Sequence, residues 1–173
     1  MYHACKLKFG AVTNLTDARY AAAVYADWIG FRLDPSHPRY IDPAKAKEII
    51  DWISGSSLVA ELGTLMPDDI LSALEVLQID TVQVSSQAAA DAWKLAGYEV
   101  ILEGVGQADY TLSPESAEGQ HLLDITDYSM EQLKDLQAKP PFAIQINGGD
   151  ETGPGLRDFA DIDDMLAFFE LEE

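Results

Sequence analysis

The chain has few of the residues that nucleic acids and acidic membranes require. Its 173 residues include 11 lysines and arginines against 30 aspartates and glutamates, a formal net charge of −19. Binding to DNA or RNA depends on a basic surface, so we expect no nucleic-acid partner. An anionic membrane surface is disfavoured for the same reason. We interpret the charge as a solvated acidic surface that keeps the protein in solution.

Cysteine and histidine are also scarce. The single cysteine, Cys5, leaves no partner for an intrachain disulfide, and His3, His37 and His121 lack the spacing of metal ligands. We therefore expect neither a metal nor a cofactor. No apolar run approaches the ~20 residues that span a bilayer, and residues 1–6 lack the apolar stretch of a secretion signal. These absences predict a cytoplasmic protein with no membrane partner.

Short apolar segments alternate with helical ones along the first two thirds of the chain. Strands are predicted at 7–12, 28–33, 57–62, 80–84 and 99–105, and helices at 14–25, 43–53, 67–77 and 88–95. The strands are almost wholly apolar, as is typical of parallel strands buried on both faces. The alternation predicts an α/β fold in one domain spanning residues 1–173, either an open doubly wound sheet or a closed barrel.

The last third is less regular. Residues 104–120 contain three glycines, one proline and no helical period. Beyond them the pattern predicts strands at 121–125 and 141–147, and helices at 129–137 and 161–170.

Four separated stretches resemble the phosphoribosylanthranilate isomerases of tryptophan biosynthesis. Residues 8–14, Lys-Phe-Gly-Ala-Val-Thr-Asn, are similar to the family's Lys-Ile-Cys-Gly-Ile-Thr-Asn. Residues 35–40 with Pro43 resemble its Pro-Lys-Ser-Pro-Arg-Tyr loop, and residues 80–84 its Asp-Val-Val-Gln-Leu. Residues 141–158 resemble its last strand, phosphate loop and following Pro-Gly-x-Lys-Asp. The resemblance implies a TIM (β/α)8-type barrel with its site at the C-terminal ends of the strands.

The resemblance implies a missing catalytic base. In that family a carboxylic acid protonates the furanose ring oxygen, and a cysteine thiolate takes a proton from the neighbouring carbon in an Amadori rearrangement. The position of this cysteine is Gly10, which has no side chain to accept a proton. Cys5 lies five residues earlier, on the opposite face of the strand, where we expect a buried and inert thiol. The chain is thus predicted to be a divergent, non-isomerising relative, a pseudoenzyme.

The resemblance also implies ligand-binding residues. Arg39 matches the arginine that pairs with the anthranilate carboxylate, although a structural ion pair is an alternative. Gln83 matches a glutamine near the active end of strand four, where it also suits a barrel-lining hydrogen bond. Asn147, Gly148 and Gly149 occupy the phosphate-loop positions, with a plain tight turn as the alternative. Together they predict a small anionic or phosphorylated molecule as the partner.

The acid has two alternative positions. Residues 121–126 resemble the family's Leu-Leu-Asp-Thr, which makes Asp124 the acid on strand six but leaves the barrel one βα unit short. An ungapped count back from the last loop makes this segment strand seven and residues 109–113 strand six, without an acid. That register allows fewer residues before strand six than the roughly dozen that a parallel crossover needs. We favour it, with an irregular or reversed connection near 106–120 and a helix or βα unit missing around residues 105–125.

Three functions remain open. The first is a non-isomerising protein that binds a small anionic or phosphorylated ligand through Arg39 and residues 147–149. The second is an isomerase whose base is a substitute such as Asp34 or Glu61, and the third is a protein-interaction scaffold. Four carboxylates follow or end predicted strands: Asp34, Glu61, Glu103 and Asp124. Clustered carboxylates suit acid–base chemistry, but solvated rim residues are the simpler interpretation.

Overall fold

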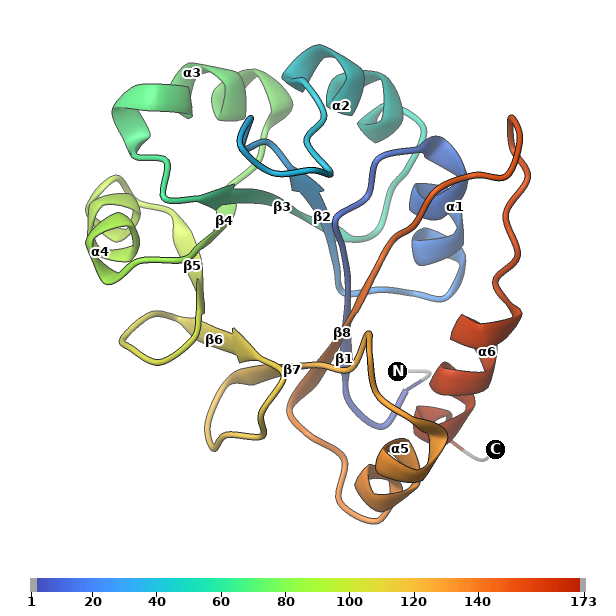
Figure 1. Ribbon diagram of the computed structural model, residues 1–173. Helices are drawn as coiled ribbons and strands as arrows, with labels where there is room; N and C mark the ends of the chain where they lie inside the picture. The colour runs from blue at the N-terminus through green and yellow to red at the C-terminus, as the bar shows by residue number, and fades with distance from the viewer. Residues whose placement is uncertain (1–2, 172–173) are drawn as a thin grey trace.

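Eight parallel strands close into a barrel in chain order (Figure 1), as the computed structural model of residues 3–171 shows. The strands are β1 Lys6–Gly10, β2 Trp28–Arg32, β3 Ser57–Gly63, β4 Thr81–Val84, β5 Glu99–Glu103, β6 Tyr110–Ser113, β7 His121–Asp124 and β8 Ala143–Asn147. The helices are α1 Leu15–Ala23, α2 Pro43–Ile50, α3 Pro67–Leu77, α4 Gln87–Leu95, α5 Met130–Gln137, α6 Ala160–Leu166 and a 3₁₀ turn, Ala167–Phe169. The expected TIM-type barrel is confirmed.

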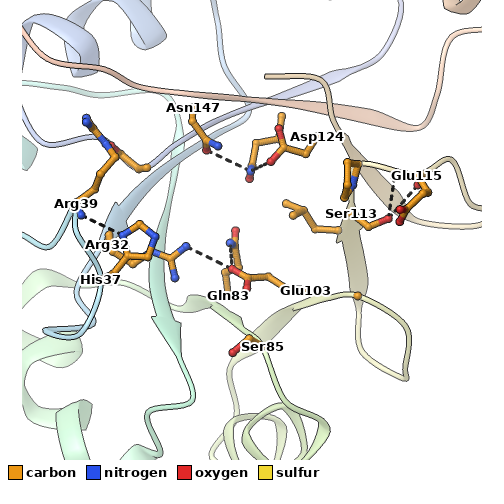
Figure 2. A pocket seen from close by; sticks show the side chains of 15 residues that line it. Arg32, His37, Arg39, Gln83, Ser85, Glu103, Ser113, Glu115, Asp124 and Asn147 are labelled. Atoms are coloured by element: carbon orange, nitrogen blue, oxygen red, sulfur yellow. Dashed lines mark hydrogen bonds and ion pairs between the residues drawn. The ribbon is translucent and has the colours of Figure 1, made fainter. Parts of the chain in front are cut away.

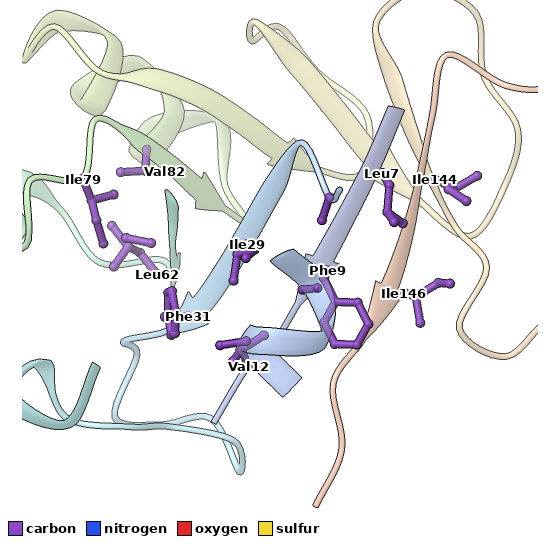
Figure 3. Packing of buried hydrophobic residues seen from close by; sticks show 14 of the residues in the cluster. Leu7, Phe9, Val12, Ile29, Phe31, Leu62, Ile79, Val82, Ile144 and Ile146 are labelled. Atoms are coloured by element: carbon purple, nitrogen blue, oxygen red, sulfur yellow. The ribbon is translucent and has the colours of Figure 1, made fainter. Parts of the chain in front are cut away.

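Alternation along the strands produces two apolar regions. Side chains that point outward, such as Leu7, Phe9 and Ile144, join the core between the barrel and its helices (Figure 3). Inward-pointing residues form a separate cluster inside the barrel: Trp28, Val59, Ile101, Leu112, Leu122 and Ala143. Polar capping starts the helices at the strand ends, because the side chains of Asn14 and Ser86 accept backbone N–H groups of α1 and α4.

The structure decides between the two registers of the last third. β6 pairs parallel with both β5 and β7, so His121–Asp124 is the seventh strand. The register that placed Asp124 on strand six is therefore wrong. The connection near residues 106–120 is irregular, one of the two forms expected, and it is not reversed. No strand is missing, and the irregularity is confined to the crossovers.

Two crossovers contain no helix, and Figure 1 accordingly shows only loops outside β6. Residues 104–109 join β5 to β6, and residues 114–120 join β6 to β7. β6 and β7 have 4 residues each, and a strand of that length rises only about 13 Å. Six or seven extended residues, the length of each connection, span roughly 20 Å. This is enough for the chain to return from the C-terminal end of one strand to the N-terminal end of the next.

Hydrogen bonds replace the missing helices. Gln87 at the start of α4 binds the backbone of Gln107 through both its amide nitrogen and its oxygen, at 2.8 Å each. On the outside of β6 and β7, the Thr111 Oγ1 lies 2.8 Å from His121 Nδ1, and His121 Nε2 lies 2.9 Å from the Glu115 carbonyl oxygen. Polar side chains thus stand where a helix-covered strand would carry apolar ones.

Candidate functional site

A cavity of about 630 Å³ opens at the C-terminal ends of the strands (Figure 2). Its lining comes from nearly every strand end and includes five of the residues singled out from the sequence: Arg39, Gln83, Glu103, Asp124 and Asn147. Gly148 and Gly149 are not among the lining residues, and neither are Gly10, Asp34 or Glu61.

The space beside Gly10 is filled by other side chains. A Cβ placed on Gly10 would lie 2.7 Å from Asn147 Oδ1, 3.0 Å from Glu61 Oε2 and 3.1 Å from Lys8 Nζ. Carbon atoms do not approach polar atoms this closely without displacement. A side chain at position 10 would therefore displace one or more of these three groups.

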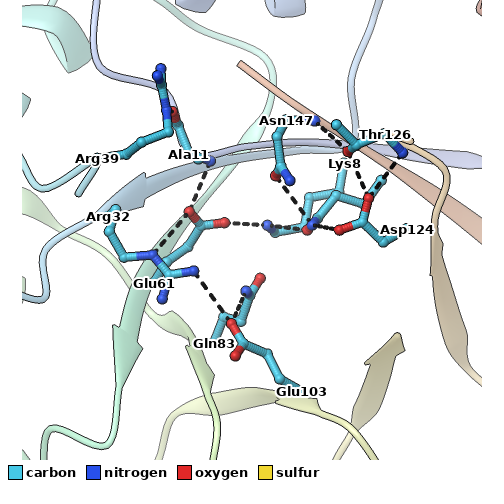
Figure 4. Close-up of polar contacts among 11 residues, drawn as sticks. Lys8, Ala11, Arg32, Arg39, Glu61, Gln83, Glu103, Asp124, Thr126 and Asn147 are labelled. Carbon is cyan, nitrogen blue, oxygen red and sulfur yellow. Dashed lines mark hydrogen bonds and ion pairs between the residues drawn. The ribbon is translucent and has the colours of Figure 1, made fainter. Parts of the chain in front are cut away.

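A buried ion pair lies at the centre of the barrel (Figure 4). Lys8 Nζ is 2.5 Å from Glu61 Oε2 and donates to Gln145 Oε1 at 2.7 Å. The side chains of Lys8 and Glu61 are 0% and 1% exposed. The other Glu61 oxygen accepts the backbone N–H of Ala11 at 2.8 Å, so both oxygens are held. The interpretation of Glu61 as a solvated rim residue, made from the sequence, is therefore wrong.

These contacts determine the ionisation of Glu61. Burial raises the pKa of its carboxyl, but the Lys8 and Arg32 cations and the hydrogen bonds from Lys8 and Ala11 outweigh burial and leave the pKa below the ordinary 4.5. A second glycine accommodates the pair, because a Cβ on Gly30 would lie 2.5 Å from Glu61 Oε2. Two strands thus omit side chains at the same level to admit this carboxylate.

The polar network continues from the ion pair to the cavity wall. Glu103 Oε1 accepts the Gln83 amide at 2.6 Å and lies 3.4 Å from an Arg32 guanidinium nitrogen. Gln83 is 2% exposed, and its carbonyl oxygen has no hydrogen-bond partner within residues 3–171. Gln83 is thus a barrel-lining hydrogen bonder that retains one unused acceptor.

Asp124 lies at the end of β7 and is held by three donors. Its Oδ1 accepts the Thr126 amide at 3.0 Å and the Thr126 hydroxyl at 2.6 Å, and its Oδ2 accepts the Gln145 amide at 3.0 Å. Thr126 in turn receives the Asn147 amide at 3.1 Å. Asp124 therefore reaches the cavity while joining the loops that follow β7 and β8.

Arg39 spans the loop after β2 and the loop after β8. Its guanidinium donates to the Ala11 carbonyl at 3.1 Å, the Thr13 hydroxyl at 3.0 Å and Asp150 at 3.0 Å. The Asp150 side chain is 87% exposed. Within the same loop, the Arg39 amide donates to His37 Nδ1 at 3.1 Å. Desolvation and the Arg32 charge lower the pKa of His37, which favours the neutral ring.

The amides of the phosphate-loop positions have internal acceptors. The Gly148 N–H donates to the Gly10 carbonyl at 2.7 Å, and the Gly149 N–H donates to Asp17 Oδ2 at 2.8 Å. Asp17 is fully buried and pairs with Arg157 at 2.8 Å. These amides are therefore bound by acceptors in β1 and α1 rather than directed into the cavity.

Sequence reasoning missed most of the central network. Lys8, Arg32 and Gln145 were not singled out, although charge within an apolar strand is a visible signal. Cys5 is 4% exposed, and burial with the nearby Asp27 charge raises the pKa of its thiol to about 12, so the expected inert cysteine is found. Within residues 3–171 no three His, Cys, Asp or Glu side chains group as metal ligands. No helix in that range has the length and hydropathy to cross a membrane.

Comparison with known proteins gives a consistent set of relatives. The N-(5'-phosphoribosyl)anthranilate isomerase of Chlorobium phaeovibrioides is 30% identical over 116 residues, 64% of this chain and 52% of that protein. The enzyme of the same name from Syntrophus aciditrophicus is 24% identical over 199 residues of alignment, 94% of this chain and 86% of that protein. With several such relatives, the chain spans about half of the relative's length. No family model matches.

The fold has close parallels among solved structures. The phosphoribosyl anthranilate isomerase of Thermus thermophilus superposes with a TM-score of 0.75 at 22% identity. The superposition covers 94% of this chain and 97% of that one. The helix-free crossovers thus leave the barrel architecture intact.

Proposed function

We propose that this chain, a divergent relative of the phosphoribosylanthranilate isomerase family, binds a small carboxylate-bearing molecule and does not isomerise it. The observation that carries the proposal is the end of β1. There Gly10 stands where the family has its base, and Glu61, Lys8 and Asn147 fill the space beside it.

The ion pair is a poor substitute for the base. A general base must reach the proton that it removes, at hydrogen-bond distance from the substrate. Glu61 is 1% exposed and lies outside the cavity lining, and Lys8 and Ala11 bind its two oxygens. Its lowered pKa further reduces its basicity. Proton abstraction from carbon would require this network to come apart.

Arg39 supports binding of a carboxylate. Arg39 is one of the cavity-lining residues, and its ion pair with Asp150 involves a carboxylate that is 87% exposed. Exposed ion pairs contribute little, about 0–1 kcal/mol, so a ligand carboxylate can replace Asp150 at small cost. A fork of guanidinium donors suits a planar carboxylate.

Binding of a phosphate by residues 147–149 is the weaker part of the expectation. The amides of Gly148 and Gly149 already have acceptors, and Asp150 and Glu151 add negative charge beside them. A phosphorylated ligand is therefore kept as an arm of the test rather than as the favoured ligand.

Complementation tests the proposal in cells. The chain is expressed in a tryptophan auxotroph that lacks the isomerase, with an active relative as the positive control. We expect no growth without tryptophan although the protein accumulates. In parallel, benzoate and inorganic phosphate are added to thermal melts of the purified chain. We expect benzoate to raise the midpoint and Arg39→Ala to abolish that shift.

One observation favours a second candidate, an isomerase with a substitute base. Glu61 Oε2 lies 3.0 Å from the place where a side chain on Gly10 would begin. If Glu61 serves as the base, the chain restores growth and Glu61→Gln abolishes it. If neither growth nor a midpoint shift with any small anion is seen, the ligand-binding proposal fails and the scaffold function is favoured.

A further inference from the structure

The cavity carries opposite charges on opposite walls. Arg32 at the end of β2, with His37 and Arg39 in the following loop, forms one side (Figure 2). Asp124 at the end of β7 and Glu115 in the preceding crossover form the other, and Glu103 lies between the two. A ligand of a single charge would meet repulsion on one of these walls.

Acceptors on the β4–β5 side are not fully used. Both contacts to Glu103 go to one oxygen, Oε1, and its side chain is 29% exposed. The neighbouring Gln83 directs its amide nitrogen to Glu103, which fixes the orientation of the amide because a reversed one would face oxygen to oxygen. Its carbonyl oxygen is then left without a donor in the structure. Gln83 and Glu103 can therefore accept hydrogen bonds from a donor group of a ligand.

The charge of the whole chain restricts the ligand further. With a formal net charge of −19, the protein repels a free anion at long range, whereas a zwitterion carries no net charge to repel. At short range a zwitterion matches Arg32 and Glu103, whose opposite charges lie 3.4 Å apart at the cavity.

We propose that the cavity binds a small amino-acid-like zwitterion, with its carboxylate at Arg39 and Arg32 and its protonated amine at Glu103 and Gln83. This inference rests on the proposed carboxylate site and adds the recognition of the amine. It identifies a class of ligand, small molecules with one carboxylate and one ammonium group, without a phosphate.

The test uses the full chain and matched ligand series. The 20 proteinogenic amino acids are screened by ligand-observed NMR and thermal melts, and each one that binds is compared with its N-acetyl and carboxamide derivatives. We expect at least one free amino acid to bind and each derivative to bind at least about tenfold more weakly, as expected for loss of a charged hydrogen bond.

Substitution of Glu103 tests whether this residue binds the ammonium group of the ligand. Glu103→Gln should weaken binding of the free amino acid about tenfold. It should not weaken binding of benzoate, because Arg32, 3.4 Å from Glu103, then loses a competing carboxylate. Glu118→Gln, on an exposed loop outside the cavity, should change neither. Equal binding of free and N-acetylated forms, or binding of benzoate without any amino acid, overturns the zwitterion inference alone. Equal binding of the free and carboxamide forms, or no binding by benzoate and amino acids alike, overturns the carboxylate site as well.

Discussion

At the end of β1, Gly10 has no side chain, and the space beside it is filled by the side chains of Asn147, Glu61 and Lys8. Gly10 and Gly30 lie on neighbouring strands, and a Cβ on either would collide with the Lys8–Glu61 pair or with Asn147. Removing one partner of a buried ion pair destabilises a protein by about 3–5 kcal/mol. A side chain at position 10 or 30 that pushed the pair apart would therefore be unfavourable. Placing a cysteine at position 10 would therefore disturb the network before it restored a base.

Substitution of Gly10 tests this packing. In an open strand Gly→Ala stabilises by about 0.5–1 kcal/mol, but here we expect Gly10→Ala to destabilise by about 1–3 kcal/mol. Urea unfolding measures the difference. In an Asn147→Ala background, which removes the nearest atom, the loss should shrink. A stabilised Gly10→Ala protein would show that the space is open.

The acid limb of the stability curve tests the ion pair. Because the folded pKa of Glu61 lies below its ordinary 4.5, the pair stabilises the fold above that pH, and the contribution is lost as the pH falls through the folded pKa. Neutralising both partners, Lys8→Met with Glu61→Gln, should make the free energy of unfolding fall less steeply as the pH drops below about 5.

The exposed pair of Lys47 and Asp51 provides the matched control, since its side chains are 44% and 56% exposed. Lys47→Met with Asp51→Asn should leave the acid limb as steep as in the parent chain. An equally steep limb in the Lys8/Glu61 variant would mean that the buried pair does not titrate with unfolding.

Part of this site is predictable from residue order. Lys8 and Gly10 are two positions apart on one strand, so they share the inward face, and a charge at position 8 or 61 within an apolar strand indicates a buried partner. The identity of the partner depends on the register across β1, β2 and β3, which no local pattern contains. The interpretation of Glu61 as a solvated rim residue failed for this reason.

At the scale of elements, the region around β6 departs from a regular barrel. The sequence signal was correct that residues 104–120 carry no helix, and the ungapped match to the last strand predicted the right register. The general length of a parallel crossover argued against it, because that length assumes a helix and full-length strands. That assumption does not hold here, because β6 and β7 have only 4 residues each and a short loop can connect them.

Hydrogen exchange measures the local stability of β6 in the absence of a covering helix. With Thr111 and Ser113 on its outer side, next to His121 of β7, and no covering helix, β6 buries little apolar surface. We expect its amides to exchange at least about tenfold faster than those of β3, through local opening rather than global unfolding. Equal protection of both strands would show that the loops cover β6 as well as a helix does.

At the scale of the molecule, a charge of −19 opposes compaction. Added salt screens repulsion over distances longer than about 10 Å at 0.1 M, while the buried Lys8–Glu61 pair is screened less. We therefore expect the thermal midpoint to rise by a few degrees between roughly 20 and 300 mM NaCl. A falling midpoint would mean that attractive surface pairs outweigh the net repulsion.

The most direct test of the account is the isomerase reaction itself. The purified chain is incubated with N-(5'-phosphoribosyl)anthranilate, and its conversion is followed against a buffer blank and an active relative. The filled and sealed space beside Gly10 predicts no rate above the blank. Turnover that Glu61→Gln abolishes, and that a surface change such as Glu118→Gln leaves intact, would contradict it.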